Sequence, residues 1–187
     1  MSSRIVVMGA SWGGLGALRQ LLAALPAGFA SVIAVAQHRS SDSRTGALAH
    51  ALGETCPLPV CEVEDKDPLE PGRVHLAPAD YHLLVEDGTF ALSTDERVRF
   101  SRPSIDVLFE SAASVYGSRV VAVVLTGANS DGAAGLAAVR RSGGLTVVQD
   151  PATAERRAMP DAAIATGAAQ RVLPLSDIAS LLAELCA

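Results

Sequence analysis

The stretch IVVMGASWGG, residues 5–14, decides the fold. Its first four residues are apolar and mostly β-branched without polar alternation, which is typical of a strand buried on both faces of a parallel sheet. Glycines then flank Ser11 in the spacing Gly-x-Ser-x-Gly, and leucines recur every three or four residues from Leu15 to Leu25, which indicates a helix. A strand that turns tightly into a helix is the repeating unit of α/β proteins. The stretch therefore predicts an α/β fold with Ser11 at its first strand-to-helix turn.

The same alternation of buried strand and one-sided helix recurs outward along the chain. Further strand-like runs span residues 31–36, 120–125 and 145–148, and helical repeats span residues 105–112, 132–141 and 178–185. Because consecutive parallel strands are joined by right-handed crossovers, this order predicts a doubly wound, mostly parallel sheet with helices on both faces. The uncharged run 20–37 is interrupted by Pro26, so we interpret it as helix, turn and strand and expect no membrane-embedded segment.

Strands and helices do not alternate in the middle of the chain. Three short strand-like runs, 73–77, 81–85 and 89–93, follow one another, and Asp87-Gly88 lies between the last two. Asp-Gly between such runs is a hairpin signal, so we expect an antiparallel β-hairpin at one edge of the sheet. A chain of 187 residues suits one domain, and we predict a single domain over residues 1–187.

Composition limits the kinds of partner and the cellular compartment that we expect. The 15 Lys and Arg against 20 Asp and Glu give a net charge of −5, and no basic run could follow a phosphate backbone, so we expect no nucleic-acid partner. The three cysteines form no CxxC pair, which favours neither a disulfide framework nor a zinc site. Arg4 and the short apolar run after it do not resemble a signal peptide. We therefore predict a cytoplasmic protein.

Three polar residues follow predicted strands. Ser11 follows the first strand, His38 follows the second, and Asp131 lies in a glycine-bounded loop after the strand at 120–125. Because ligands in open α/β sheets bind outside the carboxyl ends of the strands, we expect these side chains to converge. A serine hydroxyl needs a base to take its proton and a carboxylate to orient that base. The sequence therefore predicts a Ser-His-Asp triad.

Each of these residues also has a plainer interpretation. Ser11 could bond backbone at a helix start, His38 could be structural, and Asp131 could cap a helix. The glycines between residues 9 and 16 suggest dinucleotide binding, but no window reads Gly-x-Gly-x-x-Gly, and His38 stands where an acidic residue would hold a ribose. No histidine pair has the His-Glu-x-x-His spacing of a zinc site. We predict neither a metal nor an organic cofactor.

Taken in order, these motifs resemble the catalytic domain of the chemotaxis protein-glutamate methylesterases, the CheB family. The resemblance covers nearly the whole chain. It rests on Gly9-Ala10-Ser11 with Gly13-Gly14, Gln37-His38, LAPADYH at 76–82, RPSIDVLF at 102–109, and TGANSDG at 126–132.

The resemblance implies the reaction and its residues. It implies that Ser11, His38 and Asp131 are catalytic, without a cofactor, and that the substrate is a glutamate γ-methyl ester on the cytoplasmic helices of chemoreceptors. Methanol would be released, and deamidation of receptor glutamines would be a related activity. His38 would take the Ser11 proton while Asp131 orients the imidazole. We expect the Trp12 N–H to be an oxyanion donor and Arg102 to bind substrate.

Several positions depart from the usual family pattern. The family usually begins with a receiver domain, for which this chain has no room, so we expect any receiver-type regulator to be a separate protein. Trp12 replaces a commonly small residue, Ala128-Asn129 replace Met-Gly, and Arg39-Ser40 replace Met-Pro. Because these changes lie at the rim of the predicted site, two alternatives stay open. One is an esterase of the same fold with another ester substrate, and the other is a non-catalytic interaction module.

Overall fold

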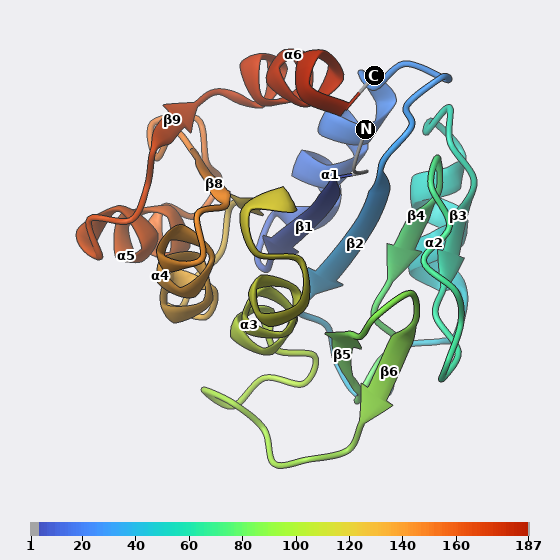
Figure 1. Ribbon diagram of the computed structural model, residues 1–187. Helices are drawn as coiled ribbons and strands as arrows, with labels where there is room; N and C mark the ends of the chain where they lie inside the picture. The colour runs from blue at the N-terminus through green and yellow to red at the C-terminus, as the bar shows by residue number, and fades with distance from the viewer. Residues whose placement is uncertain (1–3, 187) are drawn as a thin grey trace.

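Strand β1 (Ile5–Ala10) lies in the middle of the main sheet in the computed structural model, which describes residues 4–186 (Figure 1). Within these residues the sheet has seven strands in the order β3-β4-β2-β1-β7-β8-β9, and every neighbouring pair is parallel. The other strands are β2 (Val32–Gln37), β3 (Val60–Glu62), β4 (Val74–Leu76), β7 (Val120–Val124), β8 (Leu145–Gln149) and β9 (Arg171–Leu173). The central strands β1, β2 and β7 are buried along their whole length, as their unalternating sequence predicts.

Helices cover both faces of this sheet. Successive side chains of a strand point to opposite faces. Val6 and Met8 accordingly share one apolar cluster with the helices of the first face, which are α1 (Gly14–Ala23), α2 (Ala47–Gly53) and α6 (Leu175–Cys186). Val7 shares the other cluster with α3 (Ile105–Tyr116), α4 (Ala133–Arg141) and α5 (Ala158–Ala165), and a short 3₁₀ turn, η1 (Gly117–Arg119), follows α3. The predicted doubly wound α/β fold is therefore confirmed. In residues 4–186 every helix falls short of the length and apolar character that a membrane crossing needs.

The predicted hairpin is also present. Strands β5 (His82–Val85) and β6 (Phe90–Ser93) pair antiparallel, and the Glu86 N–H donates to Thr89 O across the turn at 2.8 Å. The two strands form a sheet of their own, which packs on α3 through the apolar residues of the hairpin instead of bonding to the main sheet. The run at 73–77, in contrast, contains β4, a buried parallel strand of the main sheet.

Several short elements were not predicted from the sequence, among them β3, β9 and α5. Strand β3 has only three residues, all half-buried, at the edge of the sheet, so neither its length nor its pattern marks it. Helix α5 contains Pro160 in its first turn and carries apolar residues around most of its circumference, so it lacks the one-sided repeat of the other helices.

The order of strands places a topological switch point between β1 and β7. From β1 the chain moves outward through β2 to the β3–β4 edge, and it then returns to β7 on the other side of β1. The loops that follow β1 and β7 therefore diverge in opposite directions, which opens a crevice at the carboxyl edge of the sheet. The Ser11 N–H donates to Thr126 O at 2.9 Å and joins the two loops at this point.

Candidate active site

The turn that carries Ser11 depends on glycines. A Cβ atom at Gly9 would lie 2.2 Å from Ile105 Cγ2, and one at Gly14 would lie 2.0 Å from Gln37 Oε1. Gly13 has a φ of +75°, a left-handed conformation that side chains rarely adopt. The glycines at 9, 13 and 14 therefore allow a left-handed turn that packs closely against α3 and β2.

A third close approach positions the loop after β7 on the other side of Ser11. A Cβ atom at Gly127 would lie 1.9 Å from Met159 Sδ and 2.9 Å from Ser11 Cβ. The backbone of the loop after β7 thus lies directly against the serine. Thr126 strengthens this contact, because its hydroxyl donates to Trp12 O at 2.9 Å.

The loop after β2 is tied to the serine turn. The His38 N–H donates to Ala10 O at 2.9 Å, and the Gln37 side-chain amide donates to Ser11 O and His38 O, both at 2.9 Å. Gln37 is buried, so these bonds form away from bulk water. They hold the serine and histidine loops in one arrangement.

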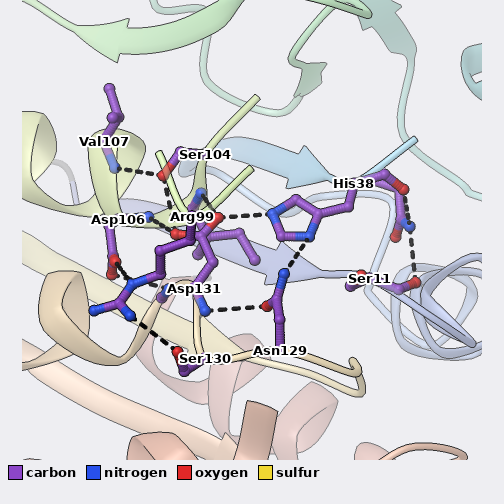
Figure 2. A network of polar contacts seen from close by, with 12 residues as sticks. Ser11, His38, Arg99, Ser104, Asp106, Val107, Asn129, Ser130 and Asp131 are labelled. Carbon is purple, nitrogen blue, oxygen red and sulfur yellow. Dashed lines mark hydrogen bonds and ion pairs between the residues drawn. The ribbon is translucent and has the colours of Figure 1, made fainter. Parts of the chain in front are cut away.

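His38 bonds to Asp131, and Figure 2 shows its ring between the Asp131 carboxylate and the Asn129 amide. The distance from His38 Nε2 to Asp131 Oδ2 is 2.7 Å, and Asp131 is fully buried. The carboxylate also accepts the backbone N–H groups of Ile105 at 2.7 Å and Asp106 at 2.9 Å, and the Ser104 hydroxyl at 2.9 Å. Its four donors satisfy both oxygens of the buried charge.

These donors decide the charge of Asp131. Burial is the largest single influence and by itself would raise the pKa of this carboxyl. The hydrogen bonds from His38 and from the backbone N–H groups of Asp106 and Ile105 outweigh it, so the pKa of Asp131 lies below its usual value. Asp131 is thus a carboxylate at neutral pH, suited to orient an imidazole.

Asp106 is a second buried carboxylate, to which the sequence analysis assigned no role. Its Oδ1 atom accepts the N–H groups of Gly132 at 2.9 Å and Gly135 at 2.7 Å, at the start of α4, and Arg99 Nε lies 3.4 Å from Oδ2. Burial and then the nearby charge of Asp131 raise the pKa of Asp106, against the opposing N–H groups and Arg99. Its position in the first turn of α3 is the one sequence signal that could have indicated a helix-terminal role.

Asn129 contacts both members of the histidine–aspartate pair. Its Oδ1 atom accepts the Asp131 N–H at 3.0 Å, which identifies the other terminal atom as the amide nitrogen. That nitrogen lies 3.4 Å from His38 Nδ1. With Nε2 donating to Asp131, the ring fits the tautomer that carries its proton on Nε2 and leaves Nδ1 as an acceptor.

Ser11 and Trp12 form the more open side of the site. Within residues 4–186 the Ser11 hydroxyl and the Trp12 backbone N–H have no hydrogen-bond partner. The indole of Trp12 is 58% exposed, donates to Glu155 Oε1 at 3.1 Å, and has the Arg156 guanidinium 5.0 Å from its ring centre. The indole N–H is therefore engaged, and the backbone N–H is the group of Trp12 that is free to act as an oxyanion donor.

Arg102 lies close to the site and is held firmly. Its guanidinium donates to Asp80 Oδ1 from Nε at 3.1 Å and from Nη2 at 2.9 Å, and to the backbone oxygens of Thr94 and Asp95. Together with His38 it lines a cavity of about 180 Å³. The side chain predicted to bind substrate thus borders the space next to the predicted base while bracing the loop after β6.

The remaining histidines lie elsewhere. His75 is buried, its Nδ1 atom is 3.1 Å from Ile33 O, and burial lowers its pKa. His82 receives the Ser104 N–H at Nδ1, and its Nε2 atom lies 3.0 Å from Glu96 O. His50 lies in α2. In the described part of the chain, His, Cys, Asp and Glu side chains nowhere gather in a group of three or more that could hold a metal ion.

The fold and this geometry define a class of protein. A doubly wound parallel sheet whose switch point carries a serine turn beside a histidine–carboxylate pair is the arrangement of an α/β hydrolytic enzyme domain. A family model described as CheB methylesterase matches residues 6–182. The chain belongs to this family, which confirms the resemblance seen in the sequence.

Individual proteins support the assignment. A relative from Leptospira interrogans is 46% identical over 186 residues, which cover 99% of this chain and 96% of the relative. A protein-glutamate methylesterase/protein-glutamine glutaminase of Anaeromyxobacter dehalogenans is 44% identical over 189 residues, and this chain spans about half of that relative's length, 52%. The crystal structure of the Thermotoga maritima CheB methylesterase catalytic domain matches with a TM-score of 0.94 and 36% identity, covering 99% of this chain and 100% of that one.

Proposed function

We propose that Ser11, His38 and Asp131 form a catalytic triad that hydrolyses glutamate γ-methyl esters on the cytoplasmic helices of chemoreceptors. The observation that carries the proposal is the 2.7 Å bond from His38 Nε2 to a fully buried Asp131, at the same switch point as the Ser11 turn. The names of the relatives supply the substrate class: one is a protein-glutamate methylesterase/protein-glutamine glutaminase.

The tautomer of His38 assigns a task to each ring nitrogen. His38 Nδ1 takes the Ser11 proton as Oγ attacks the ester carbonyl, and Asp131 stabilises the imidazolium through Nε2. The ester C–O bond then breaks, the imidazolium protonates the leaving methoxide, and methanol departs. Water attacks the glutamyl-serine ester, gives its proton to Nδ1, and releases the glutamate carboxylate and a regenerated serine. Attack on a glutamine amide follows the same steps with ammonia as the leaving group.

The oxyanion of each tetrahedral intermediate would form near the start of α1. The Trp12 backbone N–H lacks an acceptor among the described residues and lies next to the nucleophile. A free N–H at a helix N-terminus stabilises developing negative charge, and removal of one such donor costs a serine protease about 10²–10³-fold in rate. We assign this N–H as an oxyanion donor.

A methanol-release assay on methylated receptor fragments tests the proposal. We expect Ser11→Ala and His38→Ala to lose at least about 10⁴-fold in kcat relative to the wild type. Labelling with a fluorophosphonate probe, with Ser180→Ala, an exposed serine of α6, as the matched serine control, shows whether a loss of labelling is specific to Ser11. Equal labelling of wild type and Ser11→Ala would overturn the nucleophile assignment, and a wild type that neither turns over nor labels would favour an interaction module.

One observation favours a second candidate function. Trp12 is a large, exposed side chain directly beside the nucleophile, and it is tied to the loop after β8 through Glu155 and Arg156. Its bulk suits an ester other than a receptor side chain. Turnover of simple esters without turnover of methylated receptor fragments would support this alternative. The proposal also places the enzyme in the cytoplasm, with any receiver-type regulator supplied as a separate protein.

A further inference from the structure

The cavity next to His38 has an unusual lining for an acidic protein. It measures about 180 Å³ and is bordered by three arginines, Arg39, Arg97 and Arg102, with the serines at 40, 41 and 101, Pro103 and Phe100 completing its wall. Among residues 4–186 no carboxylate lines it, although the chain as a whole carries a net charge of −5. A pocket of this composition favours an anion.

Arg39 is only partly satisfied by the protein. Its side chain is 9% exposed, Nη2 donates to Ala77 O at 2.9 Å, and Nη2 also lies 2.7 Å from Glu62 Oε1 in a close ion pair without hydrogen-bond alignment. Its Nε atom is buried and has no hydrogen-bond partner among the described residues. Because a buried N–H without an acceptor costs about 1–3 kcal/mol, Arg39, which lines the cavity, carries a hydrogen-bond donor that the described part of the protein leaves unsatisfied.

The other two arginines share one counter-ion. Arg97 Nη2 lies 3.1 Å and Arg102 Nη2 2.9 Å from the same atom, Asp80 Oδ1. The three guanidinium groups of the cavity thus face two carboxylates, those of Asp80 and Glu62, and one positive charge remains uncompensated. Arg97 is about half exposed, which leaves its guanidinium able to turn toward a bound anion.

Phe100 supplies an apolar rim to this cavity. It is 95% exposed at the tip of a tight turn closed by bonds between Val98 and Ser101. Arg99 anchors the turn through contacts of 3.4 Å to Asp106 and 3.1 Å to Ser130. An exposed aromatic ring beside arginines suits a peptide that carries both apolar and acidic side chains.

We infer that this cavity is a carboxylate subsite, which binds an acidic side chain of the substrate near the ester that is cleaved. The inference rests on the proposed function and adds a sequence preference to it. Because His38 borders the cavity, an acidic residue about one helical turn from the methylated glutamate could reach the arginines while the ester reaches Ser11. The enzyme would then prefer methyl esters that lie in acidic segments.

Two matched peptides test this inference. Each carries one glutamate γ-methyl ester, with glutamate in one peptide and glutamine in the other at the positions three and four residues away on both sides. Only initial rates of methanol release are compared, because the proposed function includes slow conversion of glutamine to glutamate. At low ionic strength we expect kcat/KM to be about tenfold higher for the acidic peptide, which corresponds to about 1.4 kcal/mol. Equal kcat/KM for the two peptides, with methanol released from both, would overturn the subsite while leaving the proposed function intact.

Substitutions identify the residues that cause the preference for the acidic peptide. Arg97→Gln should reduce it to below about threefold and leave kcat/KM for the glutamine peptide within about twofold. Glu62→Gln should increase it, because Arg39 loses its counter-ion while the Gly46 N–H keeps an acceptor. The double variant Arg39→Met/Glu62→Gln avoids a buried unpaired charge and should behave like Arg97→Gln. Arg141→Gln, an exposed arginine at the end of α4, is the matched control and should keep the full preference.

Two further measurements separate the remaining outcomes. Fluorescence anisotropy with Ser11→Ala measures peptide binding without turnover. Tighter binding of the acidic peptide by this variant, together with no methanol release from either peptide by the wild type, would support the subsite and reject the proposed reaction. Free glutarate should compete with the acidic peptide at millimolar concentration and leave the glutamine peptide unaffected. Equal inhibition of both peptides by micromolar glutarate would assign the cavity to a free organic acid and overturn the inference.

Discussion

The N-termini of α3 and α4 are built alike but serve the site differently. Asp131, which precedes α4, accepts two N–H groups at the start of α3, and Asp106, which lies in the first turn of α3, accepts two N–H groups at the start of α4. Each carboxylate therefore caps the helix of the other, where the helix dipole favours negative charge. The remaining partners differ, because Asp131 also bonds to His38 inside the protein while Asp106 faces Arg99 near the surface.

This difference separates two uses of a buried carboxylate. The pKa of Asp131 is lowered and that of Asp106 is raised, although the two residues occupy the same part of the core. Asp131 has a cationic partner whenever both nitrogens of His38 are protonated, so in the proposed reaction its charge stabilises the imidazolium. Asp106 needs only an acceptor oxygen for two N–H groups. We therefore expect catalysis to require the charge at position 131 and not at position 106.

The largest expected effect comes from Asp131→Asn. The amide can place its NH₂ group toward His38 Nε2, which then becomes an acceptor and moves the ring proton to Nδ1, the nitrogen that should receive the Ser11 proton. In a serine protease the equivalent change, which traps the wrong tautomer, lowers kcat by about 10⁴-fold. We expect a loss of similar size in methanol release, with the fold retained by circular dichroism. Activity within tenfold of the wild type would contradict the role of Asp131.

Asp106→Asn is the matched variant on the other helix. Its amide oxygen can still accept the N–H groups of Gly132 and Gly135, so we expect kcat within about threefold of the wild type. Asp106→Ala, in contrast, leaves both N–H groups buried without an acceptor, and we expect it to lower the free energy of unfolding by about 2–4 kcal/mol. Urea denaturation of both variants measures this contrast. If Asp106→Asn lost as much activity as Asp131→Asn, the two carboxylates would not differ as we propose.

The sequence predicted one of these carboxylates and not the other, for a physical reason. Ser11, His38 and Asp131 follow buried strands, so the parallel topology alone brings their loops to one edge of the sheet. Asp106 acts across the packing of α3 on α4, with partners 26 and 29 residues away, and no local pattern encodes that contact.

The loops near the site show the same limit. The turn at Arg99-Phe100 has φ values of 48° and 65° without a glycine, so the sequence carries no signal for it. The Nε atom of Arg39 likewise lacks a partner in a setting that only the fold creates, because Glu62 and Ala77, which both contact Nη2, come from other parts of the chain. Local patterns thus predicted the fold and the convergence of Ser11, His38 and Asp131 on one edge of the sheet, and only the tertiary structure shows what surrounds them.

Lowering the pH should change the contributions of the Asp131 and Asp106 carboxyls to folding stability in opposite directions. Because the folded-state pKa of Asp131 lies below its unfolded value, its contribution to stability is complete above the usual aspartate pKa of about 3.9 and is lost as the pH falls through the lowered value. The folded-state pKa of Asp106 lies above its unfolded value, so its contribution is present below about pH 3.9 and is lost as the pH rises through the raised value.

Asp106→Asn isolates the second of these effects. We expect this variant to gain stability relative to the wild type as the pH rises from 3 to 7, because the wild type alone must ionise a buried carboxyl over that range. Urea unfolding of both proteins at several pH values measures the difference. A stability difference that stays constant with pH would show that the two carboxyls are not distinguished by charge.

The smallest expected effect concerns Asn129, which contacts both His38 and Asp131. Its amide nitrogen lies 3.4 Å from His38 Nδ1, where it competes weakly with the Ser11 hydroxyl for the lone pair that receives the proton. Asn129→Ser can keep an acceptor for the Asp131 N–H while its shorter side chain withdraws from the imidazole. Because a hydrogen bond of this length is worth about 0.5 kcal/mol, we expect kcat to rise about twofold with KM unchanged. A fall in kcat would instead mean that the Asn129 amide holds the ring in its reactive tautomer, and that the aspartate side of the site depends on this loop as well as on the two helix termini.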